Sequence, residues 1–187
     1  MMDLSLNATT FLVVFAYVTL AWLKTVSSGN VTIMEVLWGM GFVFIAWTRF
    51  LLTESTNLAA VLCLVCVSVW GLRLGIVLHQ RTKNRGEDPR YVRMAEAAGK
   101  NWWWVSFLQV FVLQGILLVI VALPIFALIP EEPQTIEWTT MSILLSCLCL
   151  AGFLLGLLLE HKADMELKKY RAQHGPGPVS YTHLTLP

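Results

Sequence analysis

The chain has 187 residues, of which 57% are hydrophobic and 13% are charged, and its formal net charge is +1. A soluble domain is typically about 45–50% apolar and roughly 25% charged, so this composition excludes an ordinary soluble protein and indicates an integral membrane protein. We expect membrane lipids around the chain, and nothing in its charge points to a nucleic acid as a partner.

Five apolar segments are candidates to cross a bilayer, which takes roughly 20 mostly apolar residues. In chain order they are residues 10–23, 34–52, 58–78, 102–123 and 140–159. The first segment has a short apolar centre, but no basic region precedes it as one would in a signal peptide. The pattern predicts an all-α fold, a polytopic transmembrane helical bundle with about five spans.

Lysine and arginine are unevenly distributed between the connections. The connection 79–101 and the tail after residue 159 are rich in them, whereas the first ten residues and the connection 124–139 have none. Cytoplasmic loops carry an excess of positive charge. We therefore predict that the N-terminus lies outside and the connection 79–101 in the cytoplasm, in a membrane that we expect to be a bacterial inner membrane. Arg49, which falls outside, is the one exception.

An arginine inside the third span is the strongest functional signal. Arg73 lies within the apolar run, where a charged side chain is costly and usually faces a cavity or a partner. The basic connection that follows contains Arg85, Arg90 and Tyr91 and could complete an anion site. The alternative is that Arg73 extends to the headgroups and that the loop is basic for topological reasons alone.

Further polar residues fall near the same predicted membrane face. Glu35 opens the second span, Gln109 lies about two turns into the fourth, and Glu160 and Asp164 end the fifth. We expect them to line a polar pocket open to the cytoplasm. Glu160, Asp164 and Arg171 recur at spacings of four and seven, so they share one helix face. Such a face suits a nucleotide, or it is a solvated face with internal ion pairs.

Three other motifs have a structural interpretation and indicate no catalytic or binding role. Cys63-x-x-Cys66 has no second pair or histidine cluster, so no metal site is predicted. The tryptophans 102–104 suit an interfacial aromatic belt. The spacing Gly71-x-x-x-Gly75, like that of a second glycine pair at 152 and 156, favours close helix packing.

The end of the chain shares nothing with what precedes it. Residues 179–187 can be back-translated into the transposase-adapter sequence used in DNA library preparation. We interpret them as a sequencing artefact at the end of a truncated reading frame, and leave them out of the fold prediction. The remaining residues 1–178 are then a partial membrane domain.

Residues 34–171 resemble the steroid 5-alpha-reductase C-terminal-domain superfamily, specifically its bacterial membrane branch. The resemblance is carried by the segments 35–42, 70–74, 85–91, 113–115, 123–124 and 160–167. The branch often has aspartate where Glu35 stands. The family's C-terminal arginine-histidine-proline-asparagine-tyrosine signature is absent here, which is consistent with truncation and implies that this fragment alone is inactive.

The resemblance implies a membrane-embedded NADPH-dependent reductase of a conjugated double bond in a lipid or steroid-like small molecule. The nicotinamide would supply the hydride, and Glu35 looks like the acid that faces the substrate carbonyl. Trp70 stands about where such reductases place a hydroxyl-bearing aromatic residue. The positions that look like cofactor contacts are Arg73, Arg85, Arg90, Tyr91, Glu160, Asp164 and Arg171.

Two alternatives belong to other functional classes. One is a membrane methyltransferase of the isoprenylcysteine type, which shares the superfamily fold and would use S-adenosylmethionine. The other is a non-enzymatic transport or assembly protein that would use Arg73 and Glu35 as a substrate or gating pair. The basic loop favours a phosphate-bearing cofactor and therefore the reductase.

Overall fold

The computed structural model describes residues 5–53, 57–83, 86–132 and 139–174. These residues form helices and connections, without a strand among them. Five of the helices are long and apolar enough to cross a membrane, which confirms the predicted all-α polytopic bundle. The chain divides into two compact units, Met1–Ile136 and Glu137–Pro187, which we describe separately.

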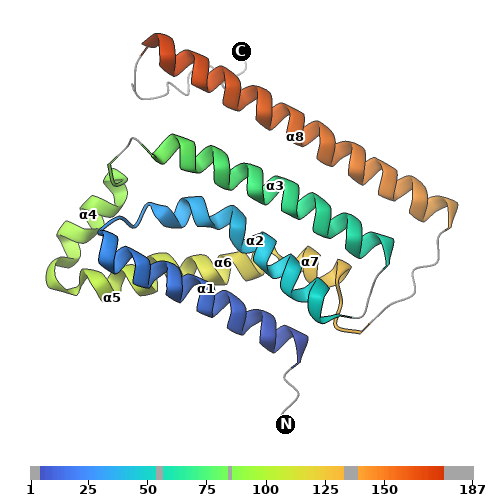
Figure 1. Cartoon of the computed structure of the whole chain (residues 1–187), viewed down its shortest axis with the longest axis horizontal. Helices are drawn as coiled ribbons and strands as arrows, with labels where there is room; N and C mark the ends of the chain where they lie inside the picture. The colour runs from blue at the N-terminus through green and yellow to red at the C-terminus, as the bar shows by residue number, and fades with distance from the viewer. Residues whose placement is uncertain (1–4, 54–56, 84–85, 133–138, 175–187) are drawn as a thin grey trace. The chain divides into compact units, whose positions relative to one another are not determined.

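The first unit is a bundle built on three long helices. These are α1 (Leu6–Ser28), α2 (Ile33–Leu52) and α3 (Leu58–Thr82). The chain continues through α4 (Pro89–Ala98), η1 (Gly99–Asn101), α5 (Trp102–Ser106), η2 (Phe107–Val112), α6 (Leu113–Val121) and α7 (Leu123–Leu128) (Figure 1). In Figure 1, α4 lies beside the connection from α1 to α2, and α7 lies where α2 ends and α3 begins. We call these two ends of the unit the α4 end and the α7 end.

Polar side chains cap the helices of this unit. Ser5 Oγ accepts a hydrogen bond from the Ala8 amide at the start of α1 (3.2 Å), and Asn57 Oδ1 accepts one from the Ala60 amide at the start of α3 (2.8 Å). Each bond satisfies an amide that has no partner within its own helix. Gly29 follows α1 with a φ of 69°, a conformation that glycine adopts without steric cost.

The structure differs from the predicted elements in three places. The segment expected to span 10–23 is part of α1, which begins at Leu6 and ends at Ser28. The connection 79–101, which was not predicted to be helical, contains helix α4. The fourth span is interrupted at η2, a π-helical segment in which the Leu113 amide bonds to the Leu108 carbonyl five residues earlier.

Glycines allow α2 and α3 to approach closely. A Cβ added at Gly39 would lie 2.7 Å from the Gly71 carbonyl oxygen, and one added at Gly71 would lie 2.6 Å from the Gly39 carbonyl oxygen. Gly75 also faces α2, at Met40 and the Val36 carbonyl. The predicted packing role of Gly71 and Gly75 is therefore confirmed.

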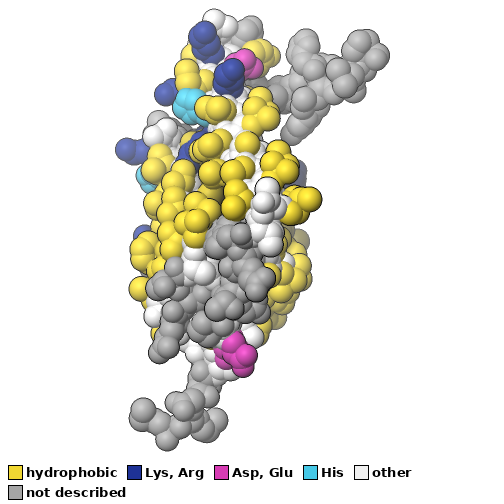
Figure 2. All heavy atoms as spheres, turned by 90° about the vertical axis from the view of Figure 1, so that its right-hand side faces the viewer, with side chains coloured by type: hydrophobic (Ala, Val, Ile, Leu, Met, Phe, Trp, Pro, Cys, Tyr) yellow, Lys and Arg dark blue, Asp and Glu magenta, His cyan; other side chains and the backbone are white. Residues whose placement is uncertain are grey.

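The inside and the outside of the bundle are both apolar. Ile45, Phe111 and Leu118 are fully buried between the helices. Large hydrophobic side chains such as Leu20, Leu51 and Ile76 are exposed, as membrane-facing residues must be, and hydrophobic side chains cover much of the face in Figure 2. This surface supports an integral membrane protein surrounded by lipid.

The described part of the second unit is one helix, α8 (Thr140–His174), of 35 residues. Its first part is the apolar segment 140–159 predicted as the fifth span. The helix continues without a break through the charged segment 160–174, as the sequence predicted. Residues 175–187, including the adapter-like segment, lie outside the described residues.

Candidate functional site

A cluster of three charged side chains lies at the α4 end. Arg90, in the first turn of α4, donates from Nε to Asp88 Oδ1 (2.9 Å) and from Nη2 to Asp88 Oδ2 (3.0 Å). Its Nη2 also donates to Glu35 Oε1 in the first turn of α2 (2.5 Å). Asp88 caps α4 by accepting from the Arg90 amide (2.8 Å). The cluster therefore joins two sequence segments that the resemblance had named separately.

The segment that carries Arg90 is fastened to the α1–α2 connection. Glu87 Oε1 accepts a hydrogen bond from the Val31 amide (2.8 Å), and the Asp88 amide donates to Thr32 Oγ1 (2.9 Å). Tyr91 is buried, with 8% of its surface exposed, and anchors the segment in the core. These contacts fix the position of Arg90, so less conformational entropy is lost when it binds a ligand.

Arg90 faces outward although it is paired. Its side chain is 63% exposed, against 30% for Glu35. Within the described residues its second terminal nitrogen, Nη1, has no hydrogen-bond partner. The hydrogen bond from Arg90 holds the pKa of Asp88 below its usual range. The cluster thus keeps a fixed guanidinium with a free donor edge at the surface.

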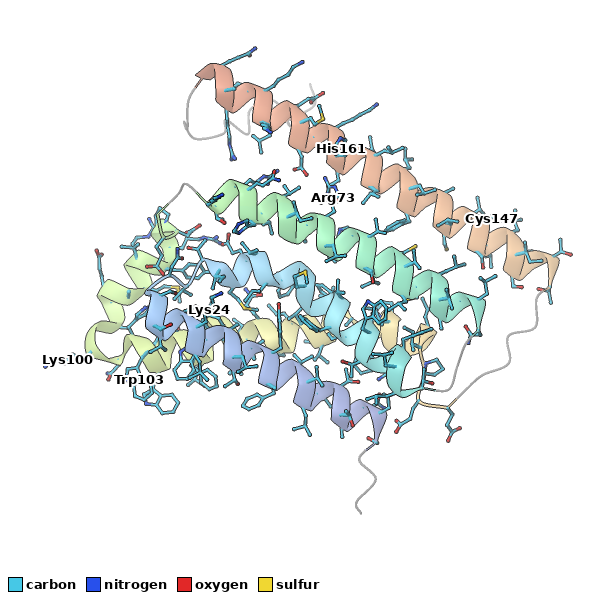
Figure 3. The ribbon with its side chains drawn as sticks, in the orientation of Figure 1. Lys24, Arg73, Lys100, Trp103, Cys147 and His161 are labelled. Atoms are coloured by element: carbon cyan, nitrogen blue, oxygen red, sulfur yellow. The ribbon has the colours of Figure 1, made fainter. Side chains whose placement is uncertain are left out.

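Arg73 and Trp70 lie deeper in the unit, on α3. Trp70 packs edge-on against the Phe42 ring of α2, with ring centroids 5.5 Å apart. Arg73 lies partway along α3 (Figure 3), and its side chain is half-buried. Because Gly71 faces Gly39 and Gly75 faces Val36 and Met40, Arg73 lies roughly 6 Å, or one helical turn, deeper than Glu35. The backbone positions of the two residues thus lie within about one helical turn of each other in depth.

The remaining expected site residues come from different segments of the sequence. Glu160, Asp164 and Arg171 lie on α8, in the second unit, at the spacing of one helix face. Arg85 lies outside the described residues. Gln109 is exposed in the π-helical segment, and its expected place in a polar pocket stays a prediction. The helix there is wider by one residue per turn, which rotates the side chains away from their α-helical positions.

The sequence reading missed a second polar centre, at the α7 end. Arg49 is 1% exposed and donates from Nε to the Ile129 carbonyl (2.8 Å) and from Nη1 to Asn7 Oδ1 (2.8 Å). Its guanidinium carbon lies 4.1 Å from the centre of the Phe126 ring. The available signal was that Arg49 breaks the charge asymmetry between the two membrane faces.

Aromatic residues surround the α4 end. The Trp22 indole donates to the Trp103 carbonyl (3.1 Å), and its ring packs against Phe107 at 4.8 Å. Lys24, Lys100 and Trp103 lie near this end (Figure 3). The expected aromatic belt is consistent with this grouping.

The chemistry available at the α4 end is anion binding and hydrogen bonding. Arg90 can bind an anion without moving. Glu35 can exchange its hydrogen bond with Arg90 for one with another donor. Among the described residues, no group of three or more His, Cys, Asp or Glu side chains is arranged to hold a metal ion.

Comparison with known proteins places the chain in a family. No curated protein and no solved structure matches it. A family model matches residues 21–178, which is most of the chain and includes both helices, α2 and α4, that carry the cluster around Arg90. The chain therefore belongs to the family described as protein of unknown function (DUF1295).

Proposed function

We propose that the chain is part of a membrane-embedded reductase that uses NADPH to reduce a conjugated double bond in a lipid or steroid-like small molecule. The relation of its family to steroid 5-alpha-reductase-like proteins supports this function. The observation that carries the proposal is the preorganised Arg90, whose exposed guanidinium suits a cofactor phosphate. The positive-inside pattern predicts the cytoplasmic side for this cluster, which is the side where NADPH is available.

The residues of the α4 end fit the phosphate part of such a cofactor. Arg90 offers Nη1, which has no partner among the residues that the structure describes, and Asp88 holds the guanidinium in place through two hydrogen bonds. Arg73, about one turn deeper on α3, is the second cation that we propose contacts the cofactor. Bound NADPH would supply the hydride, and the residues here would orient it.

Glu35 is the proposed acid that faces the substrate carbonyl. In the present arrangement its Oε1 accepts a hydrogen bond from Arg90 Nη2. We propose that Arg90 exchanges Glu35 for a phosphate, which releases the Glu35 carboxyl toward the substrate. Trp70 can orient a substrate with its indole N–H, but an indole does not relay a proton as a phenol does.

The test is a cofactor titration on the full-length protein that contains this chain, purified in detergent and read out as the melting temperature. NADPH should stabilise the protein by about 2.7 kcal/mol at a hundred times its Kd, and NADH should stabilise it less because it lacks the 2′-phosphate. Arg90→Ala should abolish the NADPH effect. Arg93→Ala removes the same charge from an exposed position of the same helix and should preserve it.

Other outcomes assign the chain differently. Stabilisation by S-adenosylmethionine and not by NADPH would favour the methyltransferase, whose cofactor has no phosphate. If neither cofactor stabilises the chain, a non-enzymatic transport or assembly role is favoured. If Arg93→Ala weakens NADPH binding as much as Arg90→Ala, the effect is one of general charge, and the role of Arg90 is refuted. Arg73→Ala and Asp164→Ala test the remaining proposed cofactor contacts in the same assay.

A further inference from the structure

The α7 end contains a pocket that the proposed reductase does not use. It has a volume of about 520 Å³ and is lined by Asn7, Phe11, Arg49, Phe126 and Glu131, among others. Its polar groups come from α1, α2 and the segment after α7. Arg49 is only 1% exposed, so its guanidinium belongs to the interior of the bundle and not to the surface.

The pocket presents a cationic donor and an anionic acceptor. Arg49 uses Nε for the Ile129 carbonyl and Nη1 for Asn7 and Thr10, and Nη2 has no partner within the described residues. Glu131 uses Oε1 to accept from the Leu6 amide (2.7 Å), and no bond to Oε2 is seen in that part of the chain. Arg49 and Glu131 form no direct ion pair there. Each therefore retains a free polar atom.

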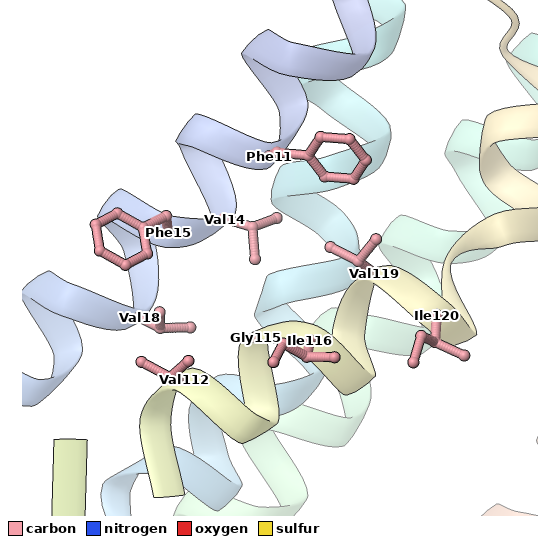
Figure 4. Close-up of a pocket in the computed structure, with 9 residues that line it drawn as sticks. All are labelled: Phe11, Val14, Phe15, Val18, Val112, Gly115, Ile116, Val119 and Ile120. Atoms are coloured by element: carbon pink, nitrogen blue, oxygen red, sulfur yellow. The ribbon is translucent and has the colours of Figure 1, made fainter. Parts of the chain in front are cut away.

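An apolar groove begins at the same place. It has a volume of about 380 Å³ and runs between α1 and the η2–α6 segment (Figure 4). Phe11 lines both the pocket and the groove, and it stacks on Phe126 with ring centroids 6.1 Å apart. From Phe11 to Val18 the groove follows α1 for about 10 Å toward the middle of the bundle. It thus continues the polar pocket into the hydrocarbon region.

We propose that this composite site binds one zwitterionic phospholipid with a primary ammonium group. The phosphate accepts hydrogen bonds from Arg49, the ammonium donates to Glu131, and one acyl chain lies in the groove against Val119. The pairing of one buried cation with one carboxylate selects this headgroup. An anionic glycerol headgroup leaves Glu131 without a cation, and a choline headgroup has no N–H to donate.

Native mass spectrometry of the full chain tests the proposal. Delipidated protein is titrated with phosphatidylethanolamine, phosphatidylglycerol and phosphatidylcholine of identical acyl chains. One ethanolamine lipid should bind at least roughly fivefold more tightly than either competitor. Retention of no lipid, or equal affinity for the three headgroups, overturns the proposal.

Two pairs of variants locate the binding. Glu131→Gln keeps an oxygen for the Leu6 amide and should lose the preference for the ethanolamine headgroup, whereas Glu132→Gln, its exposed neighbour, should retain it. Val119→Trp should fill the groove and reduce lipid retention severalfold. Leu117→Trp, on the exposed surface of the same helix and outside the groove, should not. Equal effects within either pair mean a general lipid annulus and refute the site.

Discussion

Replacing Arg49 by methionine should destabilise the first unit by about 2–3 kcal/mol. Methionine is long and apolar, so the change tests the polar contacts of Arg49 more than it tests a cavity. The guanidinium donates two hydrogen bonds of 2.8 Å, to the Ile129 carbonyl and to Asn7 Oδ1, and lies 4.1 Å from the Phe126 ring centre. All three contacts are lost together.

The magnitude follows from these contacts. A side-chain hydrogen bond inside a membrane protein contributes about 0.6 kcal/mol on average and at most about 1.7 kcal/mol. A cation–π contact at a desolvated site contributes about 2 kcal/mol. The gross loss is therefore about 3–5 kcal/mol, and removal of the buried guanidinium returns part of its desolvation cost. The remainder is the expected destabilisation.

Arg49→Lys separates charge from geometry. Lysine keeps the charge, but its single nitrogen cannot donate to the Ile129 carbonyl and to Asn7 in the forked geometry that arginine provides. Its destabilisation should be smaller than that of Arg49→Met, at about 1–2 kcal/mol. The measurement is reversible unfolding in mixed micelles, followed by circular dichroism. Arg93→Met, at an exposed position on α4, is the control and should change stability by no more than about 0.5 kcal/mol.

The reasoning fails if Arg49→Met unfolds at the same free energy as the parent chain and the Arg93 control. The contacts of Arg49 would then contribute nothing net. It also fails if Arg49→Lys is as stable as the parent chain, because the fork geometry would then be irrelevant.

Three further predictions concern the glycine contact and the α4 end. Gly39→Ala should destabilise the α2–α3 pair by about 1–3 kcal/mol, because the new methyl group meets a backbone oxygen; Gly86→Ala, which meets nothing within 4 Å, should leave the unfolding midpoint unchanged. Because Arg90 lowers the pKa of Asp88, their pairing should be fully stabilising above the ordinary aspartate pKa of about 3.9 and should be lost as the pH falls below it. Solvent screening limits this contribution to about 1 kcal/mol, and Asp88→Asn should remove the pH dependence in acid titrations of stability. Glu87→Ala should speed hydrogen exchange in the α1–α2 connection, whereas Glu87→Gln, which keeps an acceptor, should not; equal exchange in the two variants would refute the anchoring role.

Hydropathy alone predicted the existence and type of the long helices. Each of the five apolar segments became part of a membrane-length helix, because a segment of that composition must satisfy its backbone internally. Hydropathy did not predict α4, which is too short and carries too many charged residues to stand out as a membrane span. Its start was nevertheless encoded, since Asp88 followed by Pro89 is a capping residue before a first-turn proline.

The candidate site was predictable residue by residue but not as an arrangement. Glu35 and Arg90 were both named from the sequence, but their ion pair joins positions 55 residues apart. The role of Arg49 was inaccessible for the same reason, because its acceptors Asn7 and Ile129 come from two distant segments. The distribution of Lys and Arg between the connections predicts on which side of the membrane a residue lies. It does not predict which residue accepts its hydrogen bonds.

The anchoring of Glu87 and Asp88 to the α1–α2 connection imposes an order on biosynthesis. Their partners Val31 and Thr32 are synthesised 56 residues earlier. At about 5–20 residues per second, the first two helices wait roughly 3–11 s for these hydrogen bonds. During that interval the Val31 amide must donate its hydrogen bond to water or to another protein. The α1–α2 connection therefore gains these two hydrogen bonds only after the segment that precedes α4 has been synthesised.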